Sequence, residues 1–354
     1  MALQPHLDLE SLRSLLADLE ERRQRIEALD VPPLLARWLR RITEARGAHM
    51  STRIEGNPMT EQEVREVFAR PERRTEVAEI ENLNYRDAVQ FASQVAGDTS
   101  MASGPDAGLI RALHFLILRD VDRYGTAGQY RTKQNAVRHA GETIYLPPSP
   151  ADVGPLMDDL VTWIAGAGRQ GTHPLVVAAV AHAEFINIHP FDDGNGRTGR
   201  ALTSLLMFRG GWWLRGFVSA EQVFGSDVQA YYSALRAFGA KYPGQQVEFT
   251  EWAGWFLEGL TRQADARLEE ASQQLRREAL ASVGDTGQRE RLATALTYAS
   301  LFGTVTSREY AAEAGVSAAT AVSDLNWLVA SGHLERLGSG RATRYVPRGV
   351  PAEA

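Results

Sequence analysis

The sequence contains no cysteine among its 354 residues. This absence excludes a disulfide framework and a thiolate zinc site, and it is compatible with a reducing compartment. Any bound metal must therefore be held by oxygen atoms or by imidazole.

Long apolar runs are also missing, since no stretch reaches the length needed to span a membrane. The N-terminal residues lack the basic-then-apolar pattern of a signal peptide, so we expect a cytoplasmic protein without a membrane partner. The formal net charge of −6 gives the molecule no broad positive field. Any contact with nucleic acid must therefore be local.

Hydrophobic residues, by contrast, make up 44% of the chain, which is ample for buried cores. Their spacing is helical over most of the length, and short extended runs occur in two places. We predict an all-α fold with a short β-hairpin, followed by a small C-terminal α+β domain. The expected boundaries are an N-terminal helical region at 1–90, a core at 91–280 and a last domain at 285–350.

The most informative stretch runs from His189 to Arg200 and reads His-Pro-Phe-Asp-Asp-Gly-Asn-Gly-Arg-Thr-Gly-Arg. It joins two segments whose apolar residues have helical spacing. Pro190 fits the end of the first helix, and the glycines let the backbone turn and bring its amides close to a ligand. Because the start of a helix attracts phosphate, this stretch predicts an anion site.

The charged side chains of this stretch suggest chemistry beside the anion. Arg197 and Arg200 can lean over one face of the second helix and bind phosphate oxygens. Asp193 beside phosphates suggests Mg²⁺, and His189 can act as general base for an incoming hydroxyl. The structural alternative is a glycine-rich helix start beside a histidine whose hydrogen bonds are made within the protein. The spacing of the residues excludes an EF-hand or Walker loop.

The stretch resembles the Fic-family motif His-Pro-Phe-x-Asp/Glu-Gly-Asn-Gly/Lys-Arg-x-x-Arg and matches it at every fixed position. The resemblance implies a Fic-type helical core that transfers AMP from ATP to a Tyr, Thr or Ser hydroxyl of a target protein, and of itself. It implies that His189 is the base and that Asp193 holds Mg²⁺. The residues expected around the nucleotide phosphates are Gly194, Asn195, Gly196, Arg197, Thr198, Gly199 and Arg200.

A second motif lies near residue 55, at the end of a predicted helix. A carboxylate there faces the negative end of the helix dipole, so Glu55 is expected to have a cationic partner. The segment resembles the family's inhibitory motif Ser/Thr-x-x-x-Glu-Gly/Asn, with Ser51 and Glu55 at its fixed positions. The resemblance implies that Glu55 pairs with Arg200 at the γ-phosphate position and inhibits the enzyme. A solvated surface glutamate is the alternative.

Residues 137–146 are predicted to form a β-hairpin around a turn that contains glycine. In the family the corresponding flap holds the target protein by strand addition, while an ordinary surface hairpin is the alternative. Tyr232 is similar in position to a family tyrosine that packs on adenine. Packing of Tyr232 in the core is an equally good alternative, because adjacent tyrosines on a helix point to different faces.

The segment beyond residue 285 has its own pattern of helix, helix, turn with glycine, helix and two short strands. It resembles a winged-helix domain. The recognition helix that this fold would use has no Lys or Arg, whereas Arg336, Arg341 and Arg344 gather near the wing. We therefore favour contact with a protein over DNA binding. The charged helix before this domain is expected to be solvated or used in a homodimer.

Three functions remain open from the sequence. The first is an autoinhibited protein adenylyltransferase, the second a winged-helix regulator whose core senses nucleotide, and the third an enzyme in which Glu55 orients water and removes AMP. A pure sensor has no need of a base and a metal carboxylate together, so His189 and Asp193 favour an enzyme.

Overall fold

The computed structural model describes residues 3–29, 33–69, 76–98, 104–139, 142–238, 247–280, 286–340 and 343–348. The chain divides into two compact units. The first consists of Met1–Glu27 and Thr43–Asp265, and the second of Ala28–Ile42 and Ala266–Ala354.

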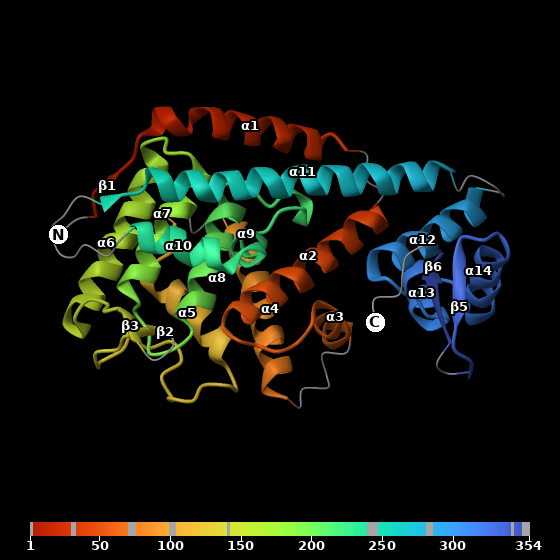
Figure 1. Cartoon of the computed structure of the whole chain (residues 1–354), viewed down its shortest axis with the longest axis horizontal. Coiled ribbons are helices and arrows are strands. Elements are labelled where there is room, and N and C mark those ends of the chain that lie inside the picture. The colour runs from red at the N-terminus through yellow and green to blue at the C-terminus, as the bar shows by residue number, and fades with distance from the viewer. Residues whose placement is uncertain are drawn as a thin grey trace. The chain divides into compact units, whose positions relative to one another are not determined.

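The described structure is mainly helical, as the sequence predicted (Figure 1). None of the described helices is both long and apolar enough to cross a membrane. The helices are α1 (Leu9–Glu27), α2 (Pro33–Ile54), α3 (Glu61–Ala69), α4 (Val77–Ala96), α5 (Ala107–Leu118), α6 (Pro150–Arg169), α7 (Pro174–Ile188), α8 (Asn195–Arg209), α9 (Ala220–Ser226), α10 (Val228–Phe238), α11 (Thr250–Leu280), α12 (Thr286–Phe302), α13 (Ser307–Ala314) and α14 (Ala318–Ala330), with a 3-10 turn η2 at Leu214–Gly216.

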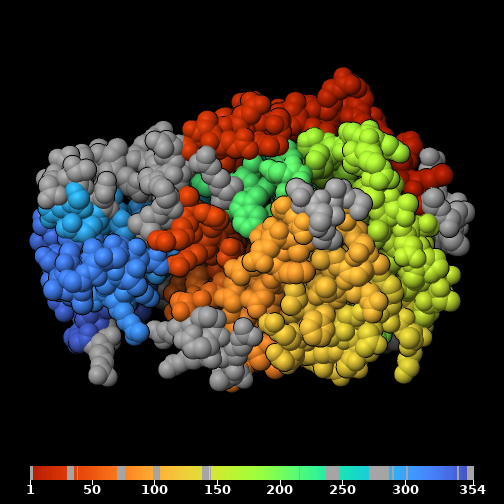
Figure 2. Space-filling view, turned by 180° about the vertical axis from the view of Figure 1, so that it is seen from behind, coloured from red at the N-terminus to blue at the C-terminus, as the bar shows by residue number. Residues whose placement is uncertain are grey.

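Within the described residues the strands are short and form three two-stranded sheets. In the first unit β1 (Pro5–His6) pairs in parallel with β4 (Val247–Glu248). The predicted hairpin consists of β2 (Val137–His139) and β3 (Glu142–Tyr145), which pair antiparallel, and its residues 140 and 141 lie outside the described structure. The segment that carries this hairpin lies on the surface of the first unit, coloured yellow in Figure 2.

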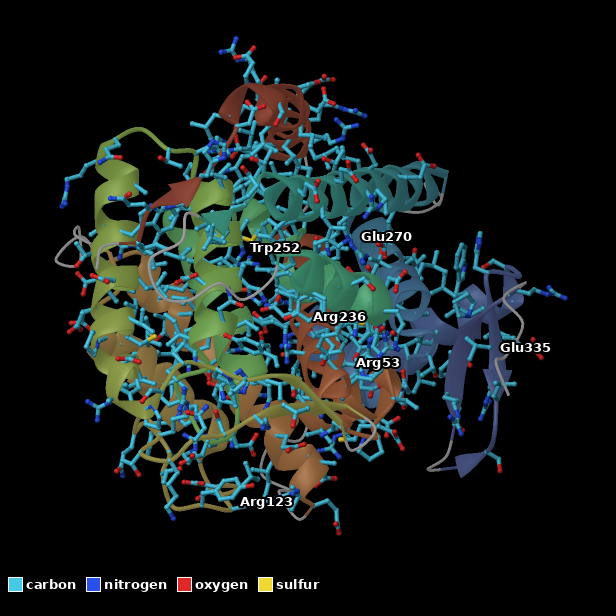
Figure 3. The ribbon with its side chains drawn as sticks, turned by 60° about the vertical axis from the view of Figure 1, so that its left-hand side comes forward. Arg53, Arg123, Arg236, Trp252, Glu270 and Glu335 are labelled. Atoms are coloured by element: carbon cyan, nitrogen blue, oxygen red, sulfur yellow. The ribbon has the colours of Figure 1, made fainter. Side chains whose placement is uncertain are left out.

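Helices α7 and α8 form the centre of the first unit. Every residue of α7 from Leu175 to Ile188 is buried except Ile186. Helix α8 packs against α7, α4 and α5, while α6 covers another side of α7. The indole Nε1 of Trp252 on α11 donates to the carbonyl of Ala179 at 2.7 Å, which ties α11 to this core (Figure 3). The loop between α7 and α8 therefore starts and ends in rigid, buried elements.

Helix α6 continues through Gly166 and Gly168 to Arg169. Its buried residues Val153, Met157, Leu160, Ile164 and Ala167 follow one apolar stripe to the last turn. Packing of this stripe offsets the low helix propensity of Gly166 and Gly168. A scale of single-residue helix propensities does not include this packing.

The second unit contains α12, α13 and α14 followed by β5 (Leu334–Leu337) and β6 (Arg344–Pro347), the element order that the sequence predicted. Thr306 and Glu309 form the capping box at the start of α13. Gly315 ends that helix with a φ of 65°, as the tight turn requires. Arg336 and Arg344 lie in the two strands, whereas Arg341 lies outside the described residues. The winged-helix assignment stays a prediction.

Candidate functional site

The loop between α7 and α8 is closed by one side chain. Phe191 N–H donates to Asn195 Oδ1 at 2.9 Å, and Asn195 Nδ2 donates to the carbonyl of Phe191 at 2.8 Å. Gly194 caps the start of α8 with a φ of 74°. A Cβ on Gly194 would lie 3.3 Å from the ring of His114, so both the conformation and the space favour glycine here. The first amides of α8 are thus presented at a fixed position.

His189 follows the last residue of α7 and has a left-handed backbone, with φ 50° and ψ 57°. Its Nδ1 lies 3.3 Å from the carbonyl of Ile186. With the ring proton on Nδ1, Nε2 keeps a free lone pair. Burial lowers the pKa of His189 from 6.5 to about 4. The imidazole is therefore neutral at pH 7, as a general base must be.

Arg200 and Glu55 form the ion pair that the inhibitory motif implied. Arg200 Nη2 lies 2.7 Å from Glu55 Oε1, while Nε donates to Ser51 Oγ at 2.8 Å. Arg200 is 1% exposed. Burial opposes the charge of Glu55, but attraction and hydrogen bonding by Arg200 outweigh it and lower the pKa of Glu55. Burial also opposes the charge of Arg200, and Glu55 raises the pKa of Arg200 in turn.

The carboxylate of Glu55 lies directly against the first turn of α8. A Cβ built on Gly196 would overlap Glu55 Oε1, so glycine is required for this approach. The side chain of Glu55 is nevertheless 35% exposed. The predicted anion site thus contains a carboxylate of the chain itself, in a position that a ligand can reach from solvent.

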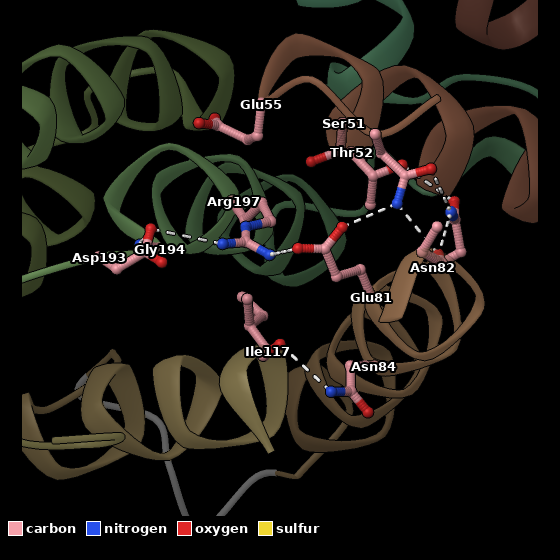
Figure 4. Close-up of polar contacts among 12 residues, drawn as sticks. Ser51, Thr52, Glu55, Glu81, Asn82, Asn84, Ile117, Asp193, Gly194 and Arg197 are labelled. Atoms are coloured by element: carbon pink, nitrogen blue, oxygen red, sulfur yellow. Dashed lines mark hydrogen bonds and ion pairs between the residues drawn. The ribbon is translucent and has the colours of Figure 1, made fainter. Parts of the chain in front are cut away.

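Arg197 pairs with a residue that the sequence analysis missed. Its guanidinium lies 3.2 Å from Glu81 Oε1 on α4 and 3.5 Å from Asp193 Oδ1 (Figure 4). Glu81 Oε2 accepts a hydrogen bond from Asn57 Nδ2 at 2.8 Å. Glu81 therefore connects Arg197 with the turn behind Glu55. Nothing local in the sequence distinguishes Glu81 from the other acidic residues of α4.

Asp193 lies at the end of the loop, just before the cap residue of α8, and its side chain is 44% exposed. Its Oδ1 accepts from the amide of Gly194 at 2.6 Å. Among the described residues, no group of three or more His, Asp or Glu side chains could hold a metal ion. A single accessible carboxylate fits Mg²⁺ that arrives with phosphate oxygens as its other ligands.

Two of the residues expected around phosphate are placed inside the helix packing. Thr198 is fully buried, and its hydroxyl has no hydrogen-bond partner within the part of the chain that the structure describes. A Cβ on Gly199 would lie 3.0 Å from Ile186 Cδ1, so this glycine lets α8 approach α7 closely. The structure brings the other members of the motif together at the start of α8.

The adjacent tyrosines of α10 have different environments. Tyr231 is 2% exposed, and its hydroxyl lies 2.9 Å from His182 Nε2 in the core. Tyr232 is 36% exposed, and both Glu55 and Arg200 are close enough to influence its pKa, which burial raises. Of the two tyrosines, Tyr232 is therefore the one with an accessible side chain.

Two further residues fix the loop and were not identified from the sequence as site residues. His114 on α5 lies with Nε2 at 2.9 Å from the carbonyl of Asp193, and its ring stacks on Phe191 with centroids 3.7 Å apart. Arg131 precedes the hairpin and donates from Nε to the carbonyl of His189 at 2.9 Å. Neither residue belongs to the loop motif or to the inhibitory motif, so no sequence pattern marked them.

The base of the hairpin is attached to the same loop. Tyr145 donates its hydroxyl to the carbonyl of Asn187 at 2.6 Å, and Asn135 Nδ2 donates to the carbonyl of Phe191 at 3.0 Å. These bonds bring the hairpin segment next to His189.

Part of the chain is similar to known proteins of one family. Residues 105–207 match the Fic/DOC family. A protein adenylyltransferase Fic from Drosophila grimshawi is 30% identical over 201 residues, which cover 56% of this chain and 40% of the relative. Its counterpart from Drosophila ananassae is 38% identical over 103 residues, which cover 29% of this chain and 20% of the relative. The chain thus spans less than half the length of these curated relatives.

Solved structures share the fold. A Fic family protein from Desulfovibrio desulfuricans G20 is 24% identical, with a TM-score of 0.63 and 99% coverage of both chains. Fic-1 from C. elegans is 22% identical, with a TM-score of 0.56, and covers 75% of this chain and 72% of its own. The matched segment, residues 105–207, includes the whole loop from His189 to Arg200, so the similarity to the Fic/DOC family extends over the candidate site.

Proposed function

We propose that this protein is an adenylyltransferase that moves AMP from ATP to a Tyr, Thr or Ser hydroxyl of a target protein, and of itself. The observation that carries the proposal is the imidazole of His189, with Nδ1 at 3.3 Å from the carbonyl of Ile186, beside a helix that carries two arginines near its start. The similarity to the Fic/DOC family and the relatives named protein adenylyltransferase support it.

In this proposal the triphosphate of ATP lies along the start of α8. The amides from Gly194 to Gly196 surround the α- and β-phosphates, and Arg197 and Arg200 bind the β- and γ-phosphates. Asp193 would hold Mg²⁺, which when bound offsets the charge of the phosphates. Tyr232 packs on adenine, since its ring is the accessible one of the pair.

The reaction is a displacement at the α-phosphorus. Nε2 of His189 takes the proton of the target hydroxyl, whose oxygen forms a bond to the α-phosphorus. The bond between the α-phosphorus and the bridging oxygen to the β-phosphate breaks, and pyrophosphate leaves. The 137–146 flap supports the target segment by strand addition and places its hydroxyl beside His189.

We further propose that Glu55 inhibits this reaction. Its carboxylate pairs with Arg200 against the first turn of α8, in the space that the γ-phosphate needs. Two negative groups cannot share Arg200 without repulsion, so ATP binds productively only when Glu55 withdraws. The second unit is proposed to be a winged-helix module that contacts a protein.

Radioactive labelling tests the function. The protein is incubated with Mg²⁺ and with ATP labelled at the α- or the γ-phosphate, in a Glu55→Gly background with or without His189→Ala. We expect α-label on protein, which His189→Ala reduces by about 10²–10⁴-fold. His333→Ala, an exposed histidine of the second unit, is the matched control and should label normally. Label from the γ-phosphate alone, or full labelling by His189→Ala, would refute the proposal.

A further inference from the structure

His189 has a strained backbone. Its φ of 50° is a left-handed conformation that residues other than glycine, asparagine and aspartate rarely adopt. Pro190 follows directly, and a residue before proline favours an extended backbone. Such strain persists only where the surroundings enforce it. Some contact must therefore hold the backbone of His189 in place.

Arg131 supplies that contact. Its guanidinium donates to the carbonyl of His189 at 2.9 Å from Nε, and to the carbonyl of Pro148 at 2.5 Å from Nη2. The amide of Arg131 donates to the carbonyl of Pro190 at 2.9 Å. The side chain is 2% exposed, so these bonds are shielded from competing water.

The bonds of Arg131 also join two parts of the proposed site. Pro148 follows β3, whereas His189 and Pro190 belong to the loop between α7 and α8. One planar fork thus fixes the position of the base relative to the end of the hairpin. The carbonyls at the end of α7 additionally favour a cation through the helix dipole.

We propose that Arg131 is a positioning residue, which holds His189 in its strained conformation and in register with the hydroxyl that the hairpin presents. This inference rests on the proposed function. Arg131 does not touch ATP in this account, because its bonds reach backbone carbonyls of the chain.

Kinetics in the Glu55→Gly background test the role. Adding Arg131→Gln should lower kcat for AMP transfer by roughly 10²-fold, the loss expected when a reacting group is displaced by about 1 Å. Arg131→Lys keeps the positive charge but lacks the planar guanidinium, and it should lose less activity than Arg131→Gln. The dissociation constant for ATP should stay within about two-fold of the background in both variants, since uniform binding is not affected.

Arg119→Gln is the matched control. Arg119 also carries partly buried contacts, to Asp87 at 2.9 Å, and none of its bonds within the described residues reaches the loop of His189. It should leave kcat unchanged. Unchanged kcat in both Arg131 variants would overturn the inference. So would a loss of kcat matched by an equal loss of ATP affinity, because that pattern indicates general unfolding. If Arg131→Gln does not fold, Arg131→Lys decides between these results.

A crystal structure of Arg131→Gln gives a readout that does not depend on activity. We expect His189 to leave the positive-φ region and its ring to shift. Retention of φ near 50° would contradict the inference even if the adenylyltransferase proposal holds. Conversely, absence of labelling by Glu55→Gly with a relaxed His189 in the Arg131 variant would refute the proposed function and leave the positioning role standing.

Discussion

The buried histidine His114 both holds the loop between α7 and α8 and makes the fold sensitive to pH. Its Nδ1 accepts from the amide of Gly128 at 2.8 Å, so the ring proton resides on Nε2 and is donated to the carbonyl of Asp193. A second proton on Nδ1 would remove the acceptor for Gly128. The folded state therefore requires the neutral form of this ring.

The pH dependence follows from this requirement. Burial lowers the pKa of His114 to about 4 in the folded state, compared with 6.5 for a histidine that is not buried. The unfolded chain binds more protons between these values, so stability falls as the pH drops from 6.5 to 4. The loss from this ring is about 3 kcal/mol at most.

Thermal unfolding of wild type and His114→Gln across this pH range measures the effect. The glutamine can donate to Asp193 but does not titrate, so its unfolding temperature should depend less on pH. Some dependence should remain, because burial also lowers the pKa of His182 to about 3 and that of His189 to about 4. Parallel curves for the two proteins would contradict this account.

Among the elements, the end of α2 determines where Glu55 lies. Gly56 has a φ of 90°, with Gly56 N–H bonded to the carbonyl of Arg53 and Asn57 N–H to that of Thr52, which is the Schellman ending of a helix. Thr52 Oγ1 also donates to Asn82 Oδ1 on α4 at 3.0 Å. The turn and this anchor together direct Glu55 toward Arg200.

Gly56→Ala should weaken the turn that places Glu55 beside Arg200. A Cβ at Gly56 meets no atom within 4 Å, so the cost is conformational and amounts to about 1–2 kcal/mol. We expect self-labelling to rise by roughly five-fold or more, since each 1.4 kcal/mol is a factor of ten in an equilibrium. Gly154→Ala is the control, because that glycine also has open space but an ordinary helical position in α6. Equal labelling by the wild type and Gly56→Ala would show that the turn does not set the inhibition.

The elements of this fold and the loop motif were predictable, and the supporting contacts were not. Helical spacing of apolar residues marked α7 and α8, and the motif placed the charged residues at their junction. Arg131, His114 and Glu81 act on the loop from segments at least 58 residues away in the sequence. Their roles depend on tertiary packing, which single-sequence periodicity does not contain.

For the molecule as a whole, the C-terminal unit raises the question of DNA binding. Helix α14 carries no Lys or Arg, and Arg336 and Arg344 lie in the strands that follow it. We expect the 354-residue chain to bind duplex DNA weakly and without sequence preference. Fluorescence anisotropy at about 50 and 200 mM salt measures this, because phosphate-driven binding weakens steeply over that range. Tight, sequence-selective binding that Arg336→Ala with Arg344→Ala abolishes would contradict our preference for a protein contact.

Self-labelling with α-labelled ATP tests most directly whether Glu55 restrains the proposed AMP-transferring site. Glu55→Gly should raise labelling by roughly 10- to 100-fold, the factor that corresponds to a charged hydrogen bond of about 1.5–3 kcal/mol. Glu55→Gln keeps the shape without the charge and should give a smaller rise. Arg200→Ala added to Glu55→Gly should lower labelling again, because the γ-phosphate then loses its partner. Unchanged or reduced labelling by Glu55→Gly would contradict the account, and loss of AMP removal in the same variant would assign Glu55 to water activation instead.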